Sequence, residues 1–339
     1  MRVPIPIRTH DNWNDTLQTH RAIHAILNIM IVSCGEALID FVPQNGDMPC
    51  YAPCPGGSPY NLAIAAARLG ASTGFLGKIS RDFFGDVLFN RLETEGVDTI
   101  FTRRSDYLST LAFVQIEGNS EPRYAFYAEN TADRNLMPED IPEALPPEVR
   151  CLEFGSISLL LDPQAKTIES LIRRESGRRA ISFDPNVRPM LIRDRLPYVA
   201  KMENLVGLCT IVKVSSADLE WLYPGKPARK SAEDWLRHGA GLVVMTRGKD
   251  GAHLITPDYE VEVPEYWVEV KDTIGAGDTF HAAFLVRLHQ LDRLTPRCVM
   301  ELTRDEAQDA VEFAVKASSL NCARQGADPP TAAQMKAVP

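Results

Sequence analysis

The stretch Lys271-Asp272-Thr273-Ile274-Gly275-Ala276-Gly277-Asp278-Thr279-Phe280 holds the strongest signal in the chain. A β-rich run from Tyr266 to Val270 precedes it, and an apolar run with helical spacing follows from Phe280 to Leu288. The two glycines and the alanine between these runs are typical of a sharp turn from a strand into a helix. Such a turn points free backbone N–H groups outward at the positive end of the helix, so we expect an anion-binding site here.

An acidic residue, Asp278, occupies the same helix start. One interpretation is that its carboxylate only caps the helix, as aspartate often does. The other is that it accepts a proton from a hydroxyl group while the turn holds the charge of a transferring phosphoryl group. The choice between them depends on the rest of the chain.

The composition bounds the kind of protein. With 339 residues, of which 45% are hydrophobic, the chain can bury one sizeable core, so we expect one large domain. A net charge of −9 argues against a nucleic-acid partner, and no apolar run reaches the ~18 residues of a membrane span. The seven scattered cysteines are typical of reduced thiols, which indicates a cytoplasmic protein. The sequence has no Walker-type P-loop, so ATP would have to bind without one.

Residues 1–29 differ in composition from the rest of the chain and are predicted to be a peripheral leader. From Met30 onward, β-rich and helix-like segments alternate. Four apolar runs of strand length are interleaved with helix-like segments, which predicts a mostly parallel sheet with helices on both faces. These runs cover 151–154, 180–183, 208–214 and 241–245.

Ligand sites in such sheets lie at the carboxyl ends of the strands. The residues predicted at these ends are Asp40, Gly155, Asp184, Ser215, Thr246 and the loop 272–278. Two further β-rich runs, 111–116 and 123–128, flank a Gly-Asn turn and predict a hairpin. A hairpin inside a βα alternation indicates a small sheet that stands off the main body.

The motif Gly56-Gly57-Ser58-Pro59-Tyr60-Asn61-Leu62-Ala63 combines a glycine pair with a helix-like run. The glycines would let a sugar approach the backbone, while Asp40 and Asn61 offer the carboxylate and amide that hydroxyl groups require. A plain turn followed by an early helical asparagine is the alternative. Together with the stretch from Asp272 to Leu285, this motif resembles the paired signatures of the PfkB (ribokinase-like) family of sugar kinases.

The resemblance covers about residues 30 to 330 and implies an α/β fold. The fold is a ribokinase-like three-layer α/β/α domain with a mostly parallel central sheet and a small β-sheet lid. We place this domain at 30–339, with lid segments at about 41–55 and 102–131. Lids of this family often pair between subunits, which implies a homodimer. The apolar residues expected on the pairing face are Leu111, Phe113, Phe126 and Tyr127.

The resemblance also implies a reaction, in which ATP, with Mg²⁺, phosphorylates a sugar hydroxymethyl group. Asp278 would be the general base, and the N–H groups of Gly275, Ala276 and Gly277 would stabilise the transferred charge. Closure of the lid would exclude water that could otherwise hydrolyse ATP. The residues expected to bind the substrate are Asp40, Gly56, Gly57, Asn61, Arg134 and Asp278.

Two segments resemble the phosphate and magnesium sites of the family. In Asp184-Pro185-Asn186-Val187-Arg188, Asn186 would lie near the phosphates and Arg188 would hold their oxygens. Ser215-Ser216-Ala217-Asp218 aligns with the N-x-x-E motif of the family, with Ser and Asp in place of Asn and Glu, and Asp218 would serve Mg²⁺. The alternatives are a surface ion pair for Arg188 and a helix-capping pair for Ser215 and Asp218.

Two later segments resemble the nucleotide and cation sites. The run Thr246-Arg247-Gly248-Lys249-Asp250-Gly251 resembles the nucleotide loop, although it could also be a plain turn into the next strand. Asp272 and the segment Ala317–Ala327 resemble the parts that house a monovalent cation such as K⁺ and the adenine-side helix. The residues expected at the nucleotide are Asn186, Arg188, Ser215, Thr246, Gly248, Gly251 and Gly277.

The sugar is inferred from smaller resemblances. The runs 36–41, 155–158 and 124–134 look like those of bacterial fructokinases, which implies fructose as substrate. The alternative is 2-keto-3-deoxygluconate, whose carboxylate would recruit a cation such as Arg134 or Arg123. An alternative of another class is a catalytically weak sugar-binding regulatory protein, which the altered magnesium motif favours and the retained Asp278 opposes.

Overall fold

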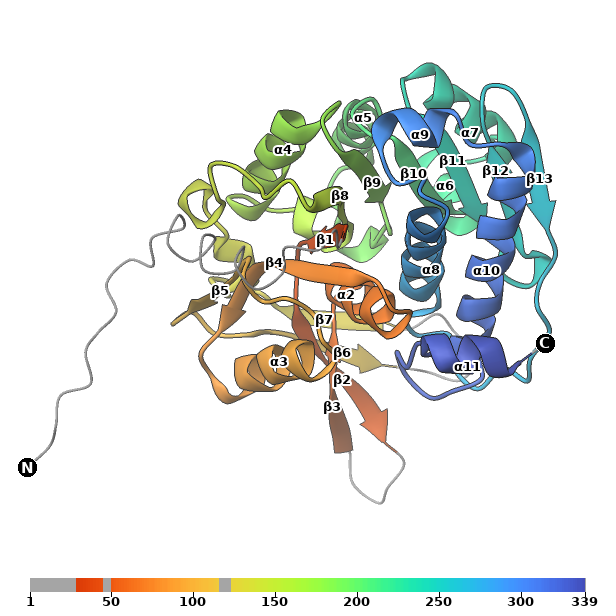
Figure 1. The fold of residues 1–339 in the computed structure, drawn as a ribbon. Helices are drawn as coiled ribbons and strands as arrows, with labels where there is room; N and C mark the ends of the chain where they lie inside the picture. The colour runs from red at the N-terminus through yellow and green to blue at the C-terminus, as the bar shows by residue number, and fades with distance from the viewer. Residues whose placement is uncertain (1–28, 45–49, 116–122, 339) are drawn as a thin grey trace, which may run out of the picture.

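The computed structural model describes residues 29–44, 50–115 and 123–338. These residues form a large sheet between two sets of helices, with a smaller sheet projecting from one side (Figure 1). The predicted leader, residues 1–29, lies outside the described residues except at its last position. Within the described part of the chain, no helix is long and apolar enough to cross a membrane.

The large sheet explains the alternation in the sequence. Its strands are β1 (Met30–Cys34), β4 (Ser72–Ser80), β5 (Thr102–Ser105), β8 (Val149–Gly155), β9 (Ala180–Asp184), β10 (Ile211–Ser215), β11 (Leu242–Thr246), β12 (Ala252–Ile255) and β13 (Glu260–Val263). They lie in the order β13-β12-β11-β10-β9-β8-β1-β4-β5. The pairs from β11 to β5 are parallel, and the two pairs that involve β12 are antiparallel.

The four apolar runs were predicted to be strands, and they correspond to β8, β9, β10 and β11, which confirms the prediction. Helices cover both faces of these central strands, so both faces of each strand are buried, and the sequence is continuously apolar rather than alternating. The last residues of these four strands lie at one edge of the sheet, as predicted. They are Gly155, Asp184, Ser215 and Thr246.

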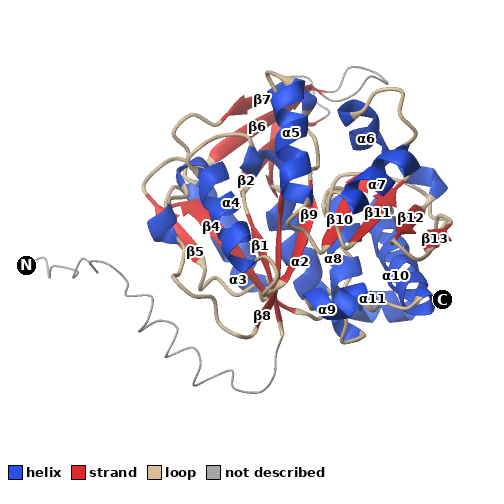
Figure 2. Ribbon diagram, turned by 90° about the horizontal axis from the view of Figure 1, so that it is seen from above, coloured by secondary structure: helices blue, strands red, loops and turns tan. Residues whose placement is uncertain are grey.

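Helices pack on both faces of the sheet (Figure 2). On one face, buried side chains of α4 (Gln164–Glu175), α5 (Arg195–Val206), α6 (Ser216–Leu222) and α7 (Ala228–Arg237) form one apolar core. On the other face, a second core joins α2 (Ser58–Arg68), α8 (Ala276–Gln290), α9 (Pro296–Met300), α10 (Arg304–Cys322) and α11 (Ala332–Ala337). Helix α3 (Phe83–Thr94) packs with α2 and β4 in a third cluster. These cores confirm the three-layer α/β architecture.

The smaller sheet contains the predicted hairpin. Its strands are β2 (Leu38–Gln44), β3 (Cys50–Gly56), β6 (Thr110–Gln115) and β7 (Arg123–Tyr127), in the order β3-β2-β6-β7. The β6 and β7 strands pair antiparallel, which confirms the hairpin, while its turn lies outside the described residues.

Two boundaries of the lid were wrong. The chain leaves the large sheet at Cys34 and resumes at Leu38 in the small one, so Asp40 is the third residue of β2 and not the end of a central strand. At the other end, β5 pairs with β4 and belongs to the large sheet. Sequence could not separate these strands because each is short and partly polar.

The two faces of the small sheet also differ from the prediction. Successive strand residues point to opposite faces, so Phe126 and Tyr127 cannot share one. Phe126 lines a cavity, whereas Tyr127 packs edge-on against Phe113, with ring centroids 5.6 Å apart. Phe113 stacks on Phe41 at 4.5 Å. The outer face is therefore aromatic, and Phe126 belongs to the inner face.

The run from Tyr266 to Val270 is a loop, not the predicted strand. Strand β13 ends at Val263 and Pro264 follows, which lacks the N–H that would continue the ladder.

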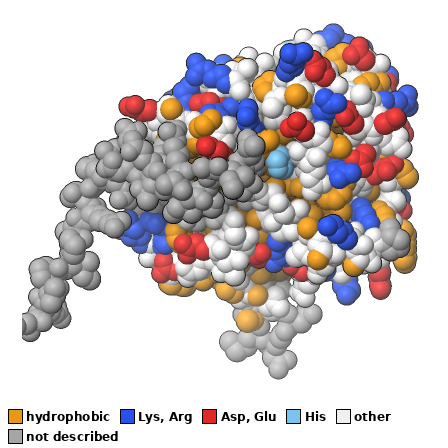
Figure 3. Space-filling view, in the orientation of Figure 1, with side chains coloured by type: hydrophobic (Ala, Val, Ile, Leu, Met, Phe, Trp, Pro, Cys, Tyr) orange, Lys and Arg blue, Asp and Glu red, His pale blue; other side chains and the backbone are white. Residues whose placement is uncertain are grey.

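On the outside of the molecule, acidic and basic side chains are interspersed over the face shown in Figure 3.

Candidate active site

The turn that precedes α8 has the conformation expected of an anion-binding helix start. Gly275 has a φ of 72°, in the left-handed region that glycine adopts most easily. A Cβ at this position would lie 2.7 Å from the Cβ of Ala327, so the site also has no room for a side chain. Ala276 and Gly277 open the helix, where backbone N–H groups have no acceptor within the helix, although the N–H of Ala276 donates to the carbonyl oxygen of Thr273 at 3.2 Å.

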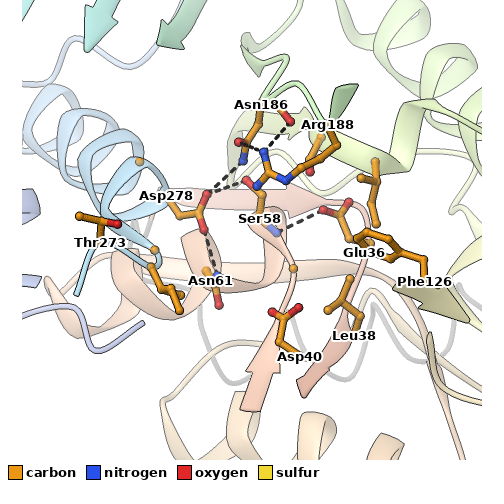
Figure 4. Close-up of a pocket in the computed structure, with 16 residues that line it drawn as sticks. Glu36, Leu38, Asp40, Ser58, Asn61, Phe126, Asn186, Arg188, Thr273 and Asp278 are labelled. Atoms are coloured by element: carbon orange, nitrogen blue, oxygen red, sulfur yellow. Dashed lines mark hydrogen bonds between the residues drawn. The ribbon is translucent and has the colours of Figure 1, made fainter. Parts of the chain in front are cut away.

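Asp278 is held at this helix start by side chains from two other elements (Figure 4). Its Oδ1 accepts a hydrogen bond from Ser58 Oγ at 2.7 Å, and its Oδ2 accepts one from Asn61 Nδ2 at 2.9 Å. Asn186 Nδ2 lies 3.5 Å from Oδ1. The carboxylate therefore joins α8, α2 and the loop after β9, rather than capping its own helix.

Burial raises the pKa of Asp278 above its ordinary value. The donors Asn61 and Ser58 act in the opposite direction, as does the nearby ammonium of Lys213. A carboxylate with a raised pKa takes up a proton more readily, which suits a general base.

A first cavity of about 320 Å³ opens in front of Asp278. Asp40 projects into it from the small sheet, and Phe126 supplies an apolar wall. Burial raises the pKa of Asp40 to about 6, against the lowering effect of Arg188. Polar residues on its walls include Glu36, Asp40, Ser58, Asn61, Ser156, Asn186, Arg188, Thr273 and Asp278. The number of hydroxyl-binding groups fits a polyol or sugar.

The glycine pair shapes this cavity without offering side chains. A Cβ at Gly56 would collide with the carboxylate of Asp40. Gly57 has a φ of 109°, and a Cβ there would lie 2.6 Å from the carbonyl oxygen of Glu36. Gly57 lines the cavity, whereas Gly56 makes room for Asp40.

A second cavity, of about 420 Å³, lies on the other side of the helix start. The glycine loop after β11 supplies Thr246, Gly248 and Gly251 to its lining. The loop that replaces the predicted strand contributes an apolar wall, together with α8 and α10. The apolar and aromatic members of this wall are Tyr266, Val268, Val270, Phe280 and Val315.

The two cavities meet at the start of α8. Thr273 and Gly277 line both of them, Gly275 lines the first and Ala276 lines the second. A group transferred from one cavity to the other would therefore pass close to the backbone N–H groups of this turn and to Asp278.

Asn186 and Arg188, which were predicted at the nucleotide, line the first cavity and not the second. Asn186 lies in left-handed conformation with a φ of 38°, which directs its side chain toward Asp278. Arg188 Nη1 donates to Asn186 Oδ1 at 2.7 Å and to two backbone carbonyl groups.

Ser215 and Asp218 form a reciprocal capping box at the start of α6. Ser215 Oγ accepts from the N–H of Asp218 at 3.0 Å, while Asp218 Oδ1 accepts from the N–H of Val187 at 3.0 Å. Neither residue lines either cavity. Burial raises the pKa of Asp218, and so does the neighbouring carboxylate of Asp184.

Asp272 ties the turn before α8 to the loop after α10. Its Oδ1 accepts from the N–H of Ile274 at 3.0 Å, and its Oδ2 accepts from the N–H of Gly326 at 2.8 Å. Asn321 Nδ2 donates to the carbonyl of Ile274, and its Oδ1 is buried without a hydrogen-bond partner among the described residues. This crossing is rich in oxygen atoms.

Arg134, which was predicted to bind the substrate, does not line the first cavity. It lies in a buried turn, η1 (Asp133–Asn135), and is only 6% exposed. The side chain of the other proposed cation, Arg123, lies outside the described residues.

Sequence reasoning missed three polar residues of the site. Ser58 was quoted within its motif but was given no role, although its hydroxyl contacts Asp278. Glu36 is buried below the first cavity and accepts from the N–H of Ser58 at 3.2 Å. Lys213, whose only signal was a charge inside an apolar strand, pairs with Asp184 behind the helix start.

The chain is similar to known sugar kinases over most of its length. A model of the pfkB family carbohydrate kinases matches residues 28–334. The fructokinase of Rhizobium leguminosarum bv. trifolii is 41% identical over 275 residues, which are 80% of this chain and 84% of that protein.

Solved structures of sugar kinases are also similar to this chain. The fructokinase with bound ATP from Xylella fastidiosa has a TM-score of 0.85 at 28% identity and covers 92% of this chain and 98% of its own. A fructokinase double mutant from Vibrio cholerae O395, in its fructose, ADP and potassium ion bound form, has a TM-score of 0.81 at 27% identity, with coverages of 91% and 98%. With its ribokinase-like fold and a family match over residues 28–334, the chain belongs to the pfkB family of carbohydrate kinases.

Proposed function

We propose that this kinase is an ATP-dependent fructokinase, which transfers the γ-phosphoryl group of ATP to a hydroxymethyl group of fructose and yields fructose 6-phosphate. The observation that carries the proposal is the position of Asp278 and the α8 start at the junction of two cavities. The choice of fructose as the substrate is supported by the relatives that are named fructokinase.

In this reaction the sugar hydroxyl oxygen forms a bond to the γ-phosphorus, and the bond from that phosphorus to the bridging oxygen of ADP breaks. The hydroxyl proton passes to the carboxylate of Asp278. The N–H groups of Gly275, Ala276 and Gly277 lie at the helix start and stabilise the charge on the transferred group. With the sugar in one cavity and ATP in the other, the sugar hydroxyl and the γ-phosphate face each other across the turn before α8.

Sugar binding uses the first cavity. Asp40 accepts hydrogen bonds from sugar hydroxyl groups, and the amide of Asn61 links the sugar to the base. Gly57 allows close approach of the sugar to the backbone. Phe126 on the inner lid face covers the apolar side of the ring and excludes water.

The nucleotide occupies the second cavity, where Thr246, Gly248 and Gly251 follow the phosphates and the apolar wall receives the base. Among the described residues, no group of three or more acidic, histidine or cysteine side chains is placed to hold a metal directly. Mg²⁺ would therefore be held largely by water and ATP phosphates, with Asp218 as the nearby carboxylate, and would neutralise phosphate charge. K⁺ would be held at the crossing of Asp272 and Asn321, whose unpartnered Oδ1 fits a cation ligand.

We also place the enzyme in the cytoplasm as a homodimer. The outer face of the lid, which carries Phe41, Tyr51, Phe113 and Tyr127, supplies an aromatic surface for a second copy. Tyr127 is 64% exposed on this face. Residues 30–339 form one kinase domain in this proposal, and 1–29 precede it as a leader.

The 2-keto-3-deoxygluconate alternative retains one supporting observation. The guanidinium group of Arg188 lines the first cavity and could meet a substrate carboxylate, a role that Arg134 cannot fill. Fructose has no carboxylate for such a pair.

The experiment measures ADP release with MgATP and each of fructose, 2-keto-3-deoxygluconate, ribose, tagatose and adenosine. Turnover on fructose that exceeds the others by a large factor in kcat/KM supports the proposal. Turnover confined to the keto acid moves the assignment to the alternative. Binding without turnover on any of these substrates favours the regulatory protein.

A further inference from the structure

The hydroxyl of Ser58 crosses from helix α2 to the carboxylate of Asp278 on helix α8. A serine at the N-cap position usually directs its hydroxyl to the N–H groups of the first turn, but Ser58 is the first residue inside helix α2. Helix α2 is instead capped at Gly57, with no side-chain cap hydrogen bond. Ser58 is 9% exposed, and its Oγ donates to Asp278 Oδ1 at 2.7 Å. The hydroxyl therefore serves the neighbouring helix rather than its own.

The backbone of Ser58 is fixed from the opposite side. Its N–H donates to Glu36 Oε1 at 3.2 Å, and Glu36 Oε2 accepts from the hydroxyl of Ser158. A Cβ added at Gly57 would lie 2.6 Å from the carbonyl oxygen of Glu36, so a side chain would not fit there. The hydroxyl is thus placed by a chain of contacts that runs from the buried Glu36 through Ser58 to Asp278.

Asn61 completes the geometry, because its amide donates to the other oxygen of Asp278 at 2.9 Å. With one donor on each oxygen, the carboxylate is oriented about its bond to Cβ. We infer that Ser58 is a positioning residue, whose hydroxyl holds Asp278 Oδ1 so that the carboxylate faces the sugar hydroxyl. The inference rests on the proposed kinase function and adds a residue to it.

Ser58 is also one of several groups that set the charge of Asp278. Burial raises the pKa of Asp278, and its donors Asn61 and Ser58 lower it. The charged groups that face Asp278 from the surrounding elements are Lys213 on β10, Asp184 on β9, Arg188 after β9, Glu153 on β8 and Asp40 on β2. Removal of the hydroxyl would take away a donor to the ionised form and so raise the pKa of Asp278 further.

The test compares Ser58→Ala with Ser58→Thr, which keeps a hydroxyl, through pH profiles of kcat/KM and separate values of kcat and KM. We expect Ser58→Ala to move the acidic limb upward by about one pH unit. We also expect kcat to fall about tenfold or more, with a smaller change in the sugar KM. Ser58→Thr should recover most of both effects.

The matched control is Ser231→Ala. Ser231 is a fully buried serine in the first turn of α7, and its hydroxyl has no hydrogen-bond partner among the described residues. Its loss should leave the pH profile and kcat unchanged. If Ser58→Ala does not fold, Ser58→Cys takes its place, because a thiol of similar shape is a weak donor.

An acidic limb and kcat in Ser58→Ala equal to those of the wild type would overturn the inference. So would equal losses in the Ala and Thr variants, since these would indicate a packing defect. If the wild type phosphorylates another sugar instead of fructose, only the proposed substrate fails, and the same comparison is made with that sugar. If it phosphorylates none, infrared titration of the carboxylate band that Asp278→Asn removes still reports whether Ser58 lowers the pKa.

Discussion

Lys213 and Asp184 form an ion pair directly behind the start of helix α8. Lys213 Nζ lies 2.7 Å from Asp184 Oδ2, and their side chains are only 4% and 2% exposed. A Cβ added to Gly277 would lie 3.1 Å from the same Nζ. The ammonium group therefore lies beneath the turn before α8, where it adds positive charge to the positive end of the helix.

Loss of Lys213 should destabilise the enzyme strongly. Burial alone would lower the pKa of Lys213, but the charge and hydrogen bond of Asp184, together with the carboxylates of Asp218 and Asp278, outweigh burial and raise the pKa, so the lysine stays charged. Lys213→Met leaves Asp184 buried without its partner, which costs about 3–5 kcal/mol. Urea unfolding at pH 7 measures this loss.

The double variant Lys213→Met/Asp184→Asn is the control, because it removes both charges. We expect it to recover much of the stability but not the ATP affinity, since the charge behind the turn is still missing. Equal stability of the single variant and the wild type would contradict the buried pair.

Asp278→Asn should abolish most turnover without weakening the fold. The amide keeps the shape of the side chain but cannot accept the hydroxyl proton, so kcat should fall about 10²- to 10⁴-fold. Burial raises the pKa of Asp278, so keeping this carboxyl ionised at neutral pH costs stability. The Asp278→Asn variant should therefore have a melting temperature at pH 7 no lower than that of the wild type. Steady-state kinetics and a thermal melt check both statements.

Asp106→Asn is a matched control, because the Asp106 side chain is 95% exposed on the surface. It should change neither kcat nor the melting temperature. Near-normal turnover in Asp278→Asn would remove Asp278 from the role of base.

The pKa of Asp40 predicts a pH-dependent sugar affinity. Burial raises this pKa to about 6, so Asp40 becomes protonated as the pH falls through 6. The protonated carboxyl accepts sugar hydroxyl groups less well, and the KM for the sugar should rise below about pH 6. In Asp40→Asn, the KM should be raised at every pH and lack this inflection.

The same shift predicts an effect on stability. A carboxyl whose pKa is raised in the folded state binds a proton more tightly there, so the fold loses stability as the pH rises from about 4 to 6. Asp40→Asn should therefore raise the melting temperature at pH 7.5 and leave it nearly unchanged at pH 3.5. A melting temperature lowered at pH 7.5 would contradict this prediction.

How far the sequence predicts the site depends on where its signals lie. Asp278 and Asn61 belong to local motifs with glycines beside them, so spacing alone placed both at helix starts. Lys213 is flanked by Val212 and Val214, and a lysine inside an apolar strand has no partner that sequence can name. Its partner Asp184 is found only because β9 and β10 are neighbours in the sheet.

The errors have a similar origin. Phe126 and Tyr127 were assigned to one face of the lid because both are aromatic, although the strand period of two separates them. Arg134 was assigned to the substrate because it is a cation near the lid, but its turn packs into the main body. Arg188 was placed at the phosphates, and its loop, with the left-handed turn at Asn186, lines the first cavity. The strand period of two could have separated Phe126 from Tyr127, whereas the places of Arg134 and Arg188 depend on directions in space that local pattern does not encode.

Gly275→Ala should separate the conformational role of the turn from its role in binding phosphate. Alanine in left-handed conformation costs about 1–2 kcal/mol at any exposed site. Gly96→Ala reports this cost alone, since Gly96 has a φ of 76° and nothing within 4 Å of an added Cβ. At Gly275 the added Cβ would also lie 2.7 Å from the Cβ of Ala327, which must move, and the turn with it.

We therefore expect Gly275→Ala to unfold at lower urea than Gly96→Ala and to lose at least tenfold in kcat, because the N–H groups that meet the transferred phosphoryl group are displaced. Gly96→Ala should retain wild-type kcat. Parallel kinetics and urea unfolding of the two variants give the comparison. If both variants kept wild-type kcat, the turn before α8 would not be the group that stabilises the transferred charge.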